Sequence, residues 1–303
     1  MNMLTVADVS TKLFGLETHP GLEHVRRYPP TGVTAQRWSV VEAALSRMWE
    51  DMSRVEGCSD PDDVAAGLER IDAAYGEVEA FLQSVDEINT TAAKGIAPAL
   101  RIFGDAVVPK VIVDFLTVSA SDPLSLTTAE IDRQCSQANE LAAMQANWSQ
   151  ARDATVARLD TLRDARRRAE ETRARAEEAV LAGSLPPLTD TESALRVELD
   201  ALITPDPEAL RELQQRMESA LQHLRRADEL AQGLLDRCTE LRGRLSAYEA
   251  KAARLGLAED TDLLSSRRIA AGLLSRKPCD LRALTRTVAD YQQILAAKRG
   301  QSR

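Results

Sequence analysis

The feature that most constrains this fold is an apolar heptad repeat that runs through residues 205–255. Apolar or apolar-tolerant side chains recur at alternating spacings of three and four residues, which places them in two rows on one face of a helix. The rows are Leu210, Met217, Leu224, Ala231, Cys238, Leu245 and Ala252, and Leu213, Ala220, Ala227, Leu234, Leu241, Tyr248 and Leu255. We call these rows the apolar seam. At about 1.5 Å per residue the helix is roughly 70 Å long, so other helices of the chain must pack along it.

The width of the seam indicates several neighbours. Leu221, Leu230 and Leu235 lie beside the two rows, at positions where a two-stranded dimer normally carries paired charges. This pattern favours an intramolecular antiparallel bundle over a two-stranded homodimer. A homo-oligomer remains the alternative.

Composition supports an all-helical, cytoplasmic protein. Among 303 residues there are only 14 Gly, 12 Pro and 4% aromatic residues, which argues against a sheet-rich enzyme. The net charge of -9 argues against general nucleic-acid binding. The four cysteines are far apart and predict free thiols in a reducing compartment. The first residues are too polar for a signal peptide, and none is expected.

We therefore predict an all-α, elongated helical bundle with a long antiparallel, coiled-coil-like helical hairpin. Helix starts are expected at Thr34, at Asp60 followed by Pro61, at Thr127 with its capping box, and at Asp280. The predicted segments are 1–33, irregular apart from one short helix near 6–14; 34–120, a helical hairpin with short apolar helices; 121–260, the long hairpin with its tip near 183–205; and 261–303, short C-terminal helices.

Residues 96–118 are the most apolar stretch of the chain. As a membrane span they would place four charged residues and Pro109 in hydrocarbon, at about 2.5 to 3.5 kcal/mol for each charge near the bilayer centre. We expect instead two short, mostly buried helices that meet near Pro109. Salt bridges are expected between Arg101 and Asp105 and between Lys110 and Asp114. Docking of this stretch on a membrane surface is kept as an alternative.

Several residues are candidates for contact with a partner. His19 lies in a Pro-Gly turn near His24, and two surface histidines are the simpler interpretation. Trp38 and Trp49 fit ligand stacking or, more commonly, helix packing. Residues 163–178 alternate arginines with acids, with Asp164 expected to pair with Arg168 and Glu171 with Arg175, as on a solvated helix. The interaction candidates are His19, Trp38, Trp49, Arg163, Arg166, Arg167 and Arg168.

The sequence carries no catalytic motif that we recognise, and it predicts no catalytic residue, cofactor or metal. Phosphate-loop, dinucleotide-binding, nucleophile-elbow and His-Glu-x-x-His patterns are absent from it, as are the Glu-x-x-His pairs of bundle metal enzymes. The first hypothesis is a non-enzymatic helical scaffold that binds partner proteins. The alternatives are a peripheral membrane protein acting through residues 96–118 and an enzyme with an unrecognised site.

Three stretches carry a resemblance to a known family. They are HPGLEHVRRYPPTGVTAQRW at residues 19–38, DPLSL at 122–126, and AYEAKAARLGLAED with KPCDLRALTRTVADYQ within 247–292. Together they resemble actinobacterial helical proteins encoded beside PknG-type serine/threonine kinases in glutamine and glutamate sensing, the GlnX-like family. The resemblance implies an adaptor role with a kinase-pathway partner. It implies no active site, and the membrane-embedded character of GlnX has no counterpart in a span here.

Overall fold

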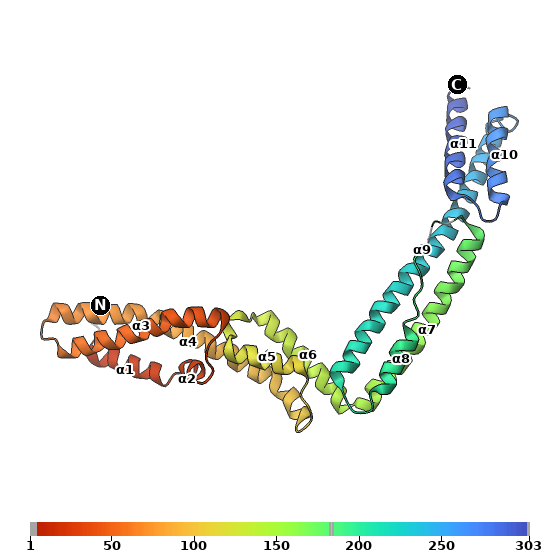
Figure 1. Cartoon of the computed structure of the whole chain (residues 1–303). Helices are drawn as coiled ribbons and strands as arrows, with labels where there is room; N and C mark the ends of the chain where they lie inside the picture. Colours follow the sequence, from red (N-terminus) through yellow and green to blue (C-terminus); the bar gives the residue numbers. More distant parts are fainter. Residues whose placement is uncertain (1–4, 182, 184, 302–303) are drawn as a thin grey trace. The chain divides into compact units, whose positions relative to one another are not determined.

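The computed structural model describes residues 5–181, 183 and 185–301 and is 84% helical. No strand is formed by these residues, so the all-α prediction is confirmed. The chain divides into two compact units, coloured red to yellow-green and green to blue in Figure 1. The first is Met1–Trp148 with Pro205–Glu208, and the second is Ser149–Thr204 with Ala209–Arg303. The four segments expected from the sequence stay a prediction.

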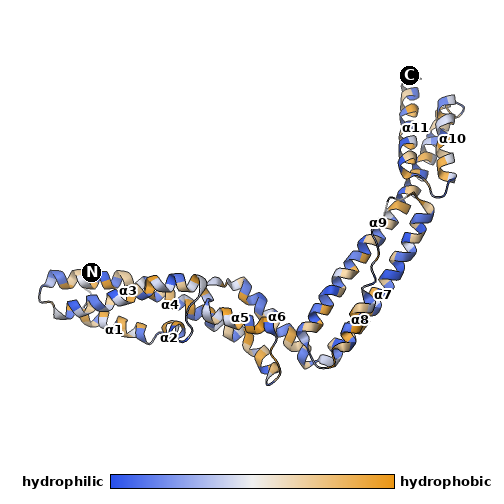
Figure 2. Ribbon diagram, in the orientation of Figure 1, coloured by the Kyte–Doolittle hydropathy of each residue, from blue (hydrophilic) through white to orange (hydrophobic). Residues whose placement is uncertain are grey.

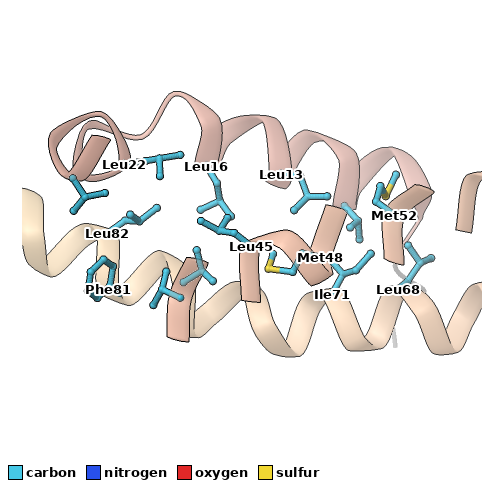
Figure 3. Close-up of a cluster of buried hydrophobic side chains, with 14 of the residues drawn as sticks. Leu13, Leu16, Leu22, Leu45, Met48, Met52, Leu68, Ile71, Phe81 and Leu82 are labelled. Carbon is cyan, nitrogen blue, oxygen red and sulfur yellow. The ribbon is translucent and has the colours of Figure 1, made fainter. Parts of the chain in front are cut away.

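The first unit is built around one long helix with shorter helices packed on it (Figure 1). Its elements are α1 (Val6–Glu17), α2 (Pro20–Arg27), α3 (Gly32–Gly57), α4 (Pro61–Phe103), α5 (Lys110–Ser121), the 3-10 turn η1 (Pro123–Ser125) and α6 (Thr128–Ala146). α3 and α4 form the predicted hairpin, and α1 and α2 cover it. Figure 3 shows their buried side chains, including Leu13, Leu22, Met48, Ile71 and Leu82, meeting between these helices.

The N-terminal segment differs from its prediction, because residues 6–27 form two helices where one short helix was expected. Thr5 starts α1 with a capping box, in which Thr5 Oγ1 accepts from the Asp8 N–H at 3.2 Å and Asp8 accepts in return. Val9, Leu13 and Leu16 follow at helical spacing and are buried. These three apolar positions were too few to show a sustained period in the sequence.

The start of α3 is also earlier than predicted. The helix begins at Gly32 and not after Thr34, and the N-cap residue Thr31 makes no side-chain cap. The cap comes instead from the distant Asp122, which accepts from the Val33 N–H at 3.2 Å and the Thr34 N–H at 2.8 Å. Sequence spacing alone does not reveal a cap that lies so far along the chain.

The apolar stretch 96–118 contains one complete short helix and the end of a longer one. α4 continues through Pro98 to Phe103 and stops at Gly104, whose φ is +52°, so the first of the two expected short helices is part of α4. α5 begins directly after Pro109, as expected. The Lys110–Asp114 salt bridge forms at 2.5 Å. The expected pair of Arg101 with Asp105 is not formed in the described structure, since the helix ends between them.

The second unit contains the helix that bears the apolar seam. Its elements are α7 (Trp148–Ala179), α8 (Glu192–Ala201), α9 (Pro207–Arg254), α10 (Thr261–Ser275) and α11 (Leu281–Gln301), with the first residues of α7 and α9 belonging to the first unit. Most of the seam is buried or half-buried within the chain, but Leu255 at its end and Leu230 beside it are exposed. Figure 2 shows the second half of α7 as mostly hydrophilic, which matches its alternating charges.

The direction of the two long helices corrects the predicted antiparallel hairpin. Early in both helices, Gln214 of α9 donates to Thr155 of α7 at 2.8 Å. The chain returns between them through α8, whose Arg196 pairs with Asp160 of α7 at 3.1 Å. α7 and α9 therefore run parallel, with α8 antiparallel to both (Figure 1). The connection is too long for a tight hairpin tip, so the rule for short connections does not apply.

Candidate functional site

Both tryptophan candidates belong to the core of the first unit. Trp38 stacks on Phe81 with ring centroids 5.9 Å apart, and Trp49 meets Phe14 edge-on at 6.1 Å. Both indoles are half-buried against the apolar cluster. This is the geometry of packing anchors. Their use in partner contact stays a prediction.

The four arginine candidates lie on α7 and take part mainly in local charge pairing. Arg166 is the best paired, with Glu170 at 2.9 Å and Asp190 at 2.5 Å, and these hydrogen bonds, first that of Asp190, raise the pKa of Arg166. The other pairs are Arg163 with Asp160 at 3.1 Å and Arg167 with Asp164 at 3.4 Å, and Arg168 is exposed. The prediction that Asp164 pairs with Arg168 is wrong, because the carboxylate reaches the guanidinium three residues on.

His19, the remaining candidate, starts helix α2. Its Nδ1 accepts from the Gly21 N–H at 3.0 Å, and Pro20 fills the first helical position. Gly21 lies directly against α4, since a Cβ on Gly21 would stand 2.8 Å from the carbonyl carbon of Leu82. α2 is therefore held against α4 more closely than any side chain at position 21 would permit.

His24 fixes the other side of the same short helix. It is only 8% exposed, and its Nε2 donates to the carbonyl oxygen of Ala120 near the end of α5 at 2.8 Å. Because a carbonyl only accepts, Nε2 carries a proton. The expectation that His24 is a surface residue is wrong.

Beside these contacts lies an open pocket of about 600 Å³ between α2, α4 and α5, which we call the α2–α4–α5 pocket. Its apolar lining includes Ala93, Val113 and Leu116. Its polar lining is Glu23, His24, Arg27, Tyr28, Asp86, Asn89, Thr117 and Ser119. Its volume lies within the range of about 300–1,000 Å³ that is usual for ligand sites, although its lining is more polar than most.

The charged side chains that line this pocket form no ion pairs with the described residues. Among the described residues no ion pair involves Glu23, Arg27 or Asp86, although charges elsewhere on these helices commonly pair. Asp86 accepts only a long hydrogen bond, 3.4 Å, from Thr90. The Arg27 guanidinium lies 5.4 Å from the centre of the Tyr28 ring, a cation–π contact that leaves its N–H groups free. The pocket thus presents one cation and two carboxylates to an entering group.

Sequence reasoning missed this pocket because its lining comes from three helices that are distant along the chain. One local signal was available: Pro20-Gly21 at the start of a helix permits a close backbone approach. Neither that signal nor the histidine spacing identifies α4 as the neighbour.

Comparison with protein-family models, curated proteins and solved structures gives no match to this chain. None of the described helices is both long and apolar enough to cross a bilayer. No group of three or more potential metal ligands occurs among the described His, Cys, Asp and Glu residues.

Proposed function

We propose that this is a non-enzymatic helical interaction protein, in which the α2–α4–α5 pocket receives a segment of a partner protein. One observation carries the proposal: Glu23, Arg27 and Asp86 border a cavity without forming ion pairs in the described structure. Charges next to an apolar wall that are not satisfied within the chain are available to groups of a ligand.

The lining suggests the chemistry of that segment. Arg27 suits a carboxylate, since a guanidinium binds carboxylates through two N–H groups. Glu23 and Asp86 suit a lysine or arginine of the partner. The wall of Ala93, Val113 and Leu116 suits an aliphatic side chain. The preferred ligand is therefore a short peptide segment with an acidic, an aliphatic and a basic residue.

The resemblance to kinase-linked helical proteins gives the proposal its biological setting. Two of the stretches that carry it, residues 19–38 and 122–126, lie near the pocket, and Asp122 joins them by capping α3. We place the protein in the cytoplasm, which its four free thiols support, and expect a partner from a serine/threonine kinase pathway.

Site-specific photo-crosslinking in the native cell tests this function. A benzoyl-phenylalanine placed at Ala93 should crosslink a distinct protein, because Ala93 is exposed and lines the pocket. The same group at Ala73, an exposed alanine elsewhere on α4, is the matched control. Adding Arg27→Ala or Asp86→Ala should weaken the Ala93 crosslink. Equal crosslinking patterns from both positions would refute the pocket as the binding site.

A second candidate function is docking on a membrane surface through the connection between α4 and α5. Val107 in this connection is 92% exposed, and Ile102 and Val113 on its two sides are about half exposed. Such residues can insert at the headgroup boundary. If the protein floats with phosphatidylcholine–phosphatidylglycerol vesicles and Val107→Asp abolishes flotation, membrane docking replaces peptide binding as the proposed function. Absence of flotation by the intact protein removes it.

A further inference from the structure

Two cysteines of the second unit meet although they are far apart in sequence. Cys238 lies half-buried on α9, and Cys279, only 2% exposed, lies two residues before the start of α11. Cys238 packs against the apolar cluster that includes Cys279, Leu241 and Leu284. The nearby Cys238 side chain adds to the raised pKa of the Cys279 thiol. Cys58 and Cys135 belong to the other unit.

The backbone holds Cys279 firmly at this place. Its N–H donates to the carbonyl oxygen of Ala179 at 3.0 Å, and its carbonyl oxygen accepts from the Leu181 N–H at 2.8 Å. The connection between α10 and α11 is thereby tied to the end of α7. The Cys279 thiol consequently meets α9 at a fixed position, and the meeting of the two thiols is built into the packing of three helices.

We propose that Cys238 and Cys279 form a redox site, a dithiol that a hydroperoxide converts reversibly to an intramolecular disulfide. This inference is independent of the peptide-binding pocket. The disulfide requires the sulfurs to approach to about 2.05 Å, and we assign this movement to rotation of the two Cys side chains within their shared apolar cluster.

The two cysteines have different roles in the reaction. Cys238 is the more exposed and reacts first: its thiolate attacks a peroxide oxygen, an S–O bond forms, the O–O bond breaks, and hydroxide leaves from hydrogen peroxide. Cys238 has then lost two electrons and is a sulfenic acid. Cys279 attacks the Cys238 sulfur, an S–S bond forms, the S–O bond breaks, and water leaves with the Cys279 proton. The sum is two thiols and one hydrogen peroxide giving one disulfide and two waters.

The surroundings of Cys279 fit the resolving role. Burial raises the pKa of its thiol, which keeps Cys279 protonated and unreactive toward peroxide in solution. The positive charge of Arg242 lowers the pKa of the Cys279 thiol, but this effect is smaller than that of burial. The same charge would stabilise the Cys279 thiolate when it attacks. A small-molecule dithiol regenerates both thiols by exchange, which takes up the two electrons lost to peroxide.

The test is peptide mapping of the full chain after treatment with one equivalent of hydrogen peroxide, with free thiols alkylated before digestion. The expected result is a Cys238–Cys279 disulfide peptide that dithiothreitol removes, with Cys58 and Cys135 still alkylated. With Cys279→Ser, the Cys238 sulfenic acid should persist and react with dimedone. Cys58→Ser, the matched control, should leave the disulfide unchanged.

The result on the wild-type chain decides the proposal even if Cys279→Ser does not fold. Oxidation of Cys58 ahead of Cys238 would overturn it. So would over-oxidation of Cys238 to the sulfinic acid without a disulfide to Cys279.

Discussion

Asp122 caps the α3 helix through Thr34, which lies 88 residues earlier in the chain. Asp122 Oδ1 accepts from both the N–H and the hydroxyl of Thr34, each at 2.8 Å, and Thr34 Oγ1 in turn accepts from the Leu124 N–H at 3.1 Å. Gly32 makes the approach possible, because a Cβ there would stand 2.8 Å from the Asp122 carboxyl carbon. This small network fixes the end of α5 against the start of α3.

Removing the Asp122 carboxylate should therefore destabilise the first unit. Asp122→Ala removes the acceptor of the first N–H groups of α3 and of the buried Thr34 hydroxyl. This loss should lower the free energy of unfolding by about 1–3 kcal/mol. Thermal unfolding followed by circular dichroism measures the loss. Asp122→Asn is the matched control, since its side-chain oxygen still caps the helix and should retain much of the stability. Equal melting temperatures for wild type and Asp122→Ala would contradict the role of this network.

Two glycines of the first unit should respond in opposite directions to alanine. Gly21→Ala should destabilise by about 1–3 kcal/mol, because its methyl group overlaps the Leu82 backbone and displaces α2 from α4. Gly76→Ala, on α4 with nothing near its Cβ position, should stabilise by about 0.5–1 kcal/mol. Urea denaturation of the two variants separates the effects. A neutral Gly21→Ala would show that α2 is not held as described.

The sequence predicted features formed within one helix better than features formed by residues that are distant along the chain. Most signals within one helix were reliable, although the predicted Asp164–Arg168 pair was not: the seam on α9, the Asp60–Pro61 start of α4 and the Asp280 start of α11 are all present. Features made by distant residues were missed, such as the Asp122 cap, the parallel course of α7 and α9, and the pocket around His24. Heptad spacing fixes which face of a helix is buried, but it carries no information about the direction of its neighbour.

The apolar seam should stabilise the single chain and not a dimer. Leu224 on α9 is 5% exposed, so Leu224→Asp should cost roughly 1.5–3 kcal/mol of burial before any desolvation of the new charge. Thermal stability should fall and protease sensitivity rise, while light scattering shows an unchanged oligomeric state. Arg167→Ala on the exposed face of α7 removes a pair typically worth about 0.3–0.5 kcal/mol and should do neither. Conversion of a stable dimer to a folded monomer by Leu224→Asp would show an intermolecular seam.

A charge pair between α10 and α11 should make the stability of the second unit depend on pH. The hydrogen bond from Lys298, at 2.9 Å, lowers the pKa of Asp260, and Asp260 and Asp262 raise the pKa of Lys298 to about 12. The stability that ionised Asp260 contributes is fully present above its ordinary pKa of 3.8, and it is lost as the pH falls through the lowered pKa. The stability that charged Lys298 contributes is fully present below its ordinary pKa of 10.5, and it is lost as the pH rises through the raised pKa of about 12.

Lys298→Gln tests this dependence. The melting temperature of the variant should lie below that of the wild type at neutral pH, and the difference should shrink as Asp260 becomes protonated. Melting curves from pH 7 to pH 2 measure the difference. A difference of constant size over this range would contradict the assigned pair.

Affinity purification from the native cell, quantified by mass spectrometry, tests the proposed function most directly. Three baits are compared: the wild type, Ala93→Trp, whose indole fills the α2–α4–α5 pocket, and Ala73→Trp, which places the same indole elsewhere on exposed α4. Circular dichroism establishes first that all three are equally folded. We predict a partner that the wild type and Ala73→Trp retain and Ala93→Trp loses. The same partners in equal amounts on all three baits would contradict binding through this pocket.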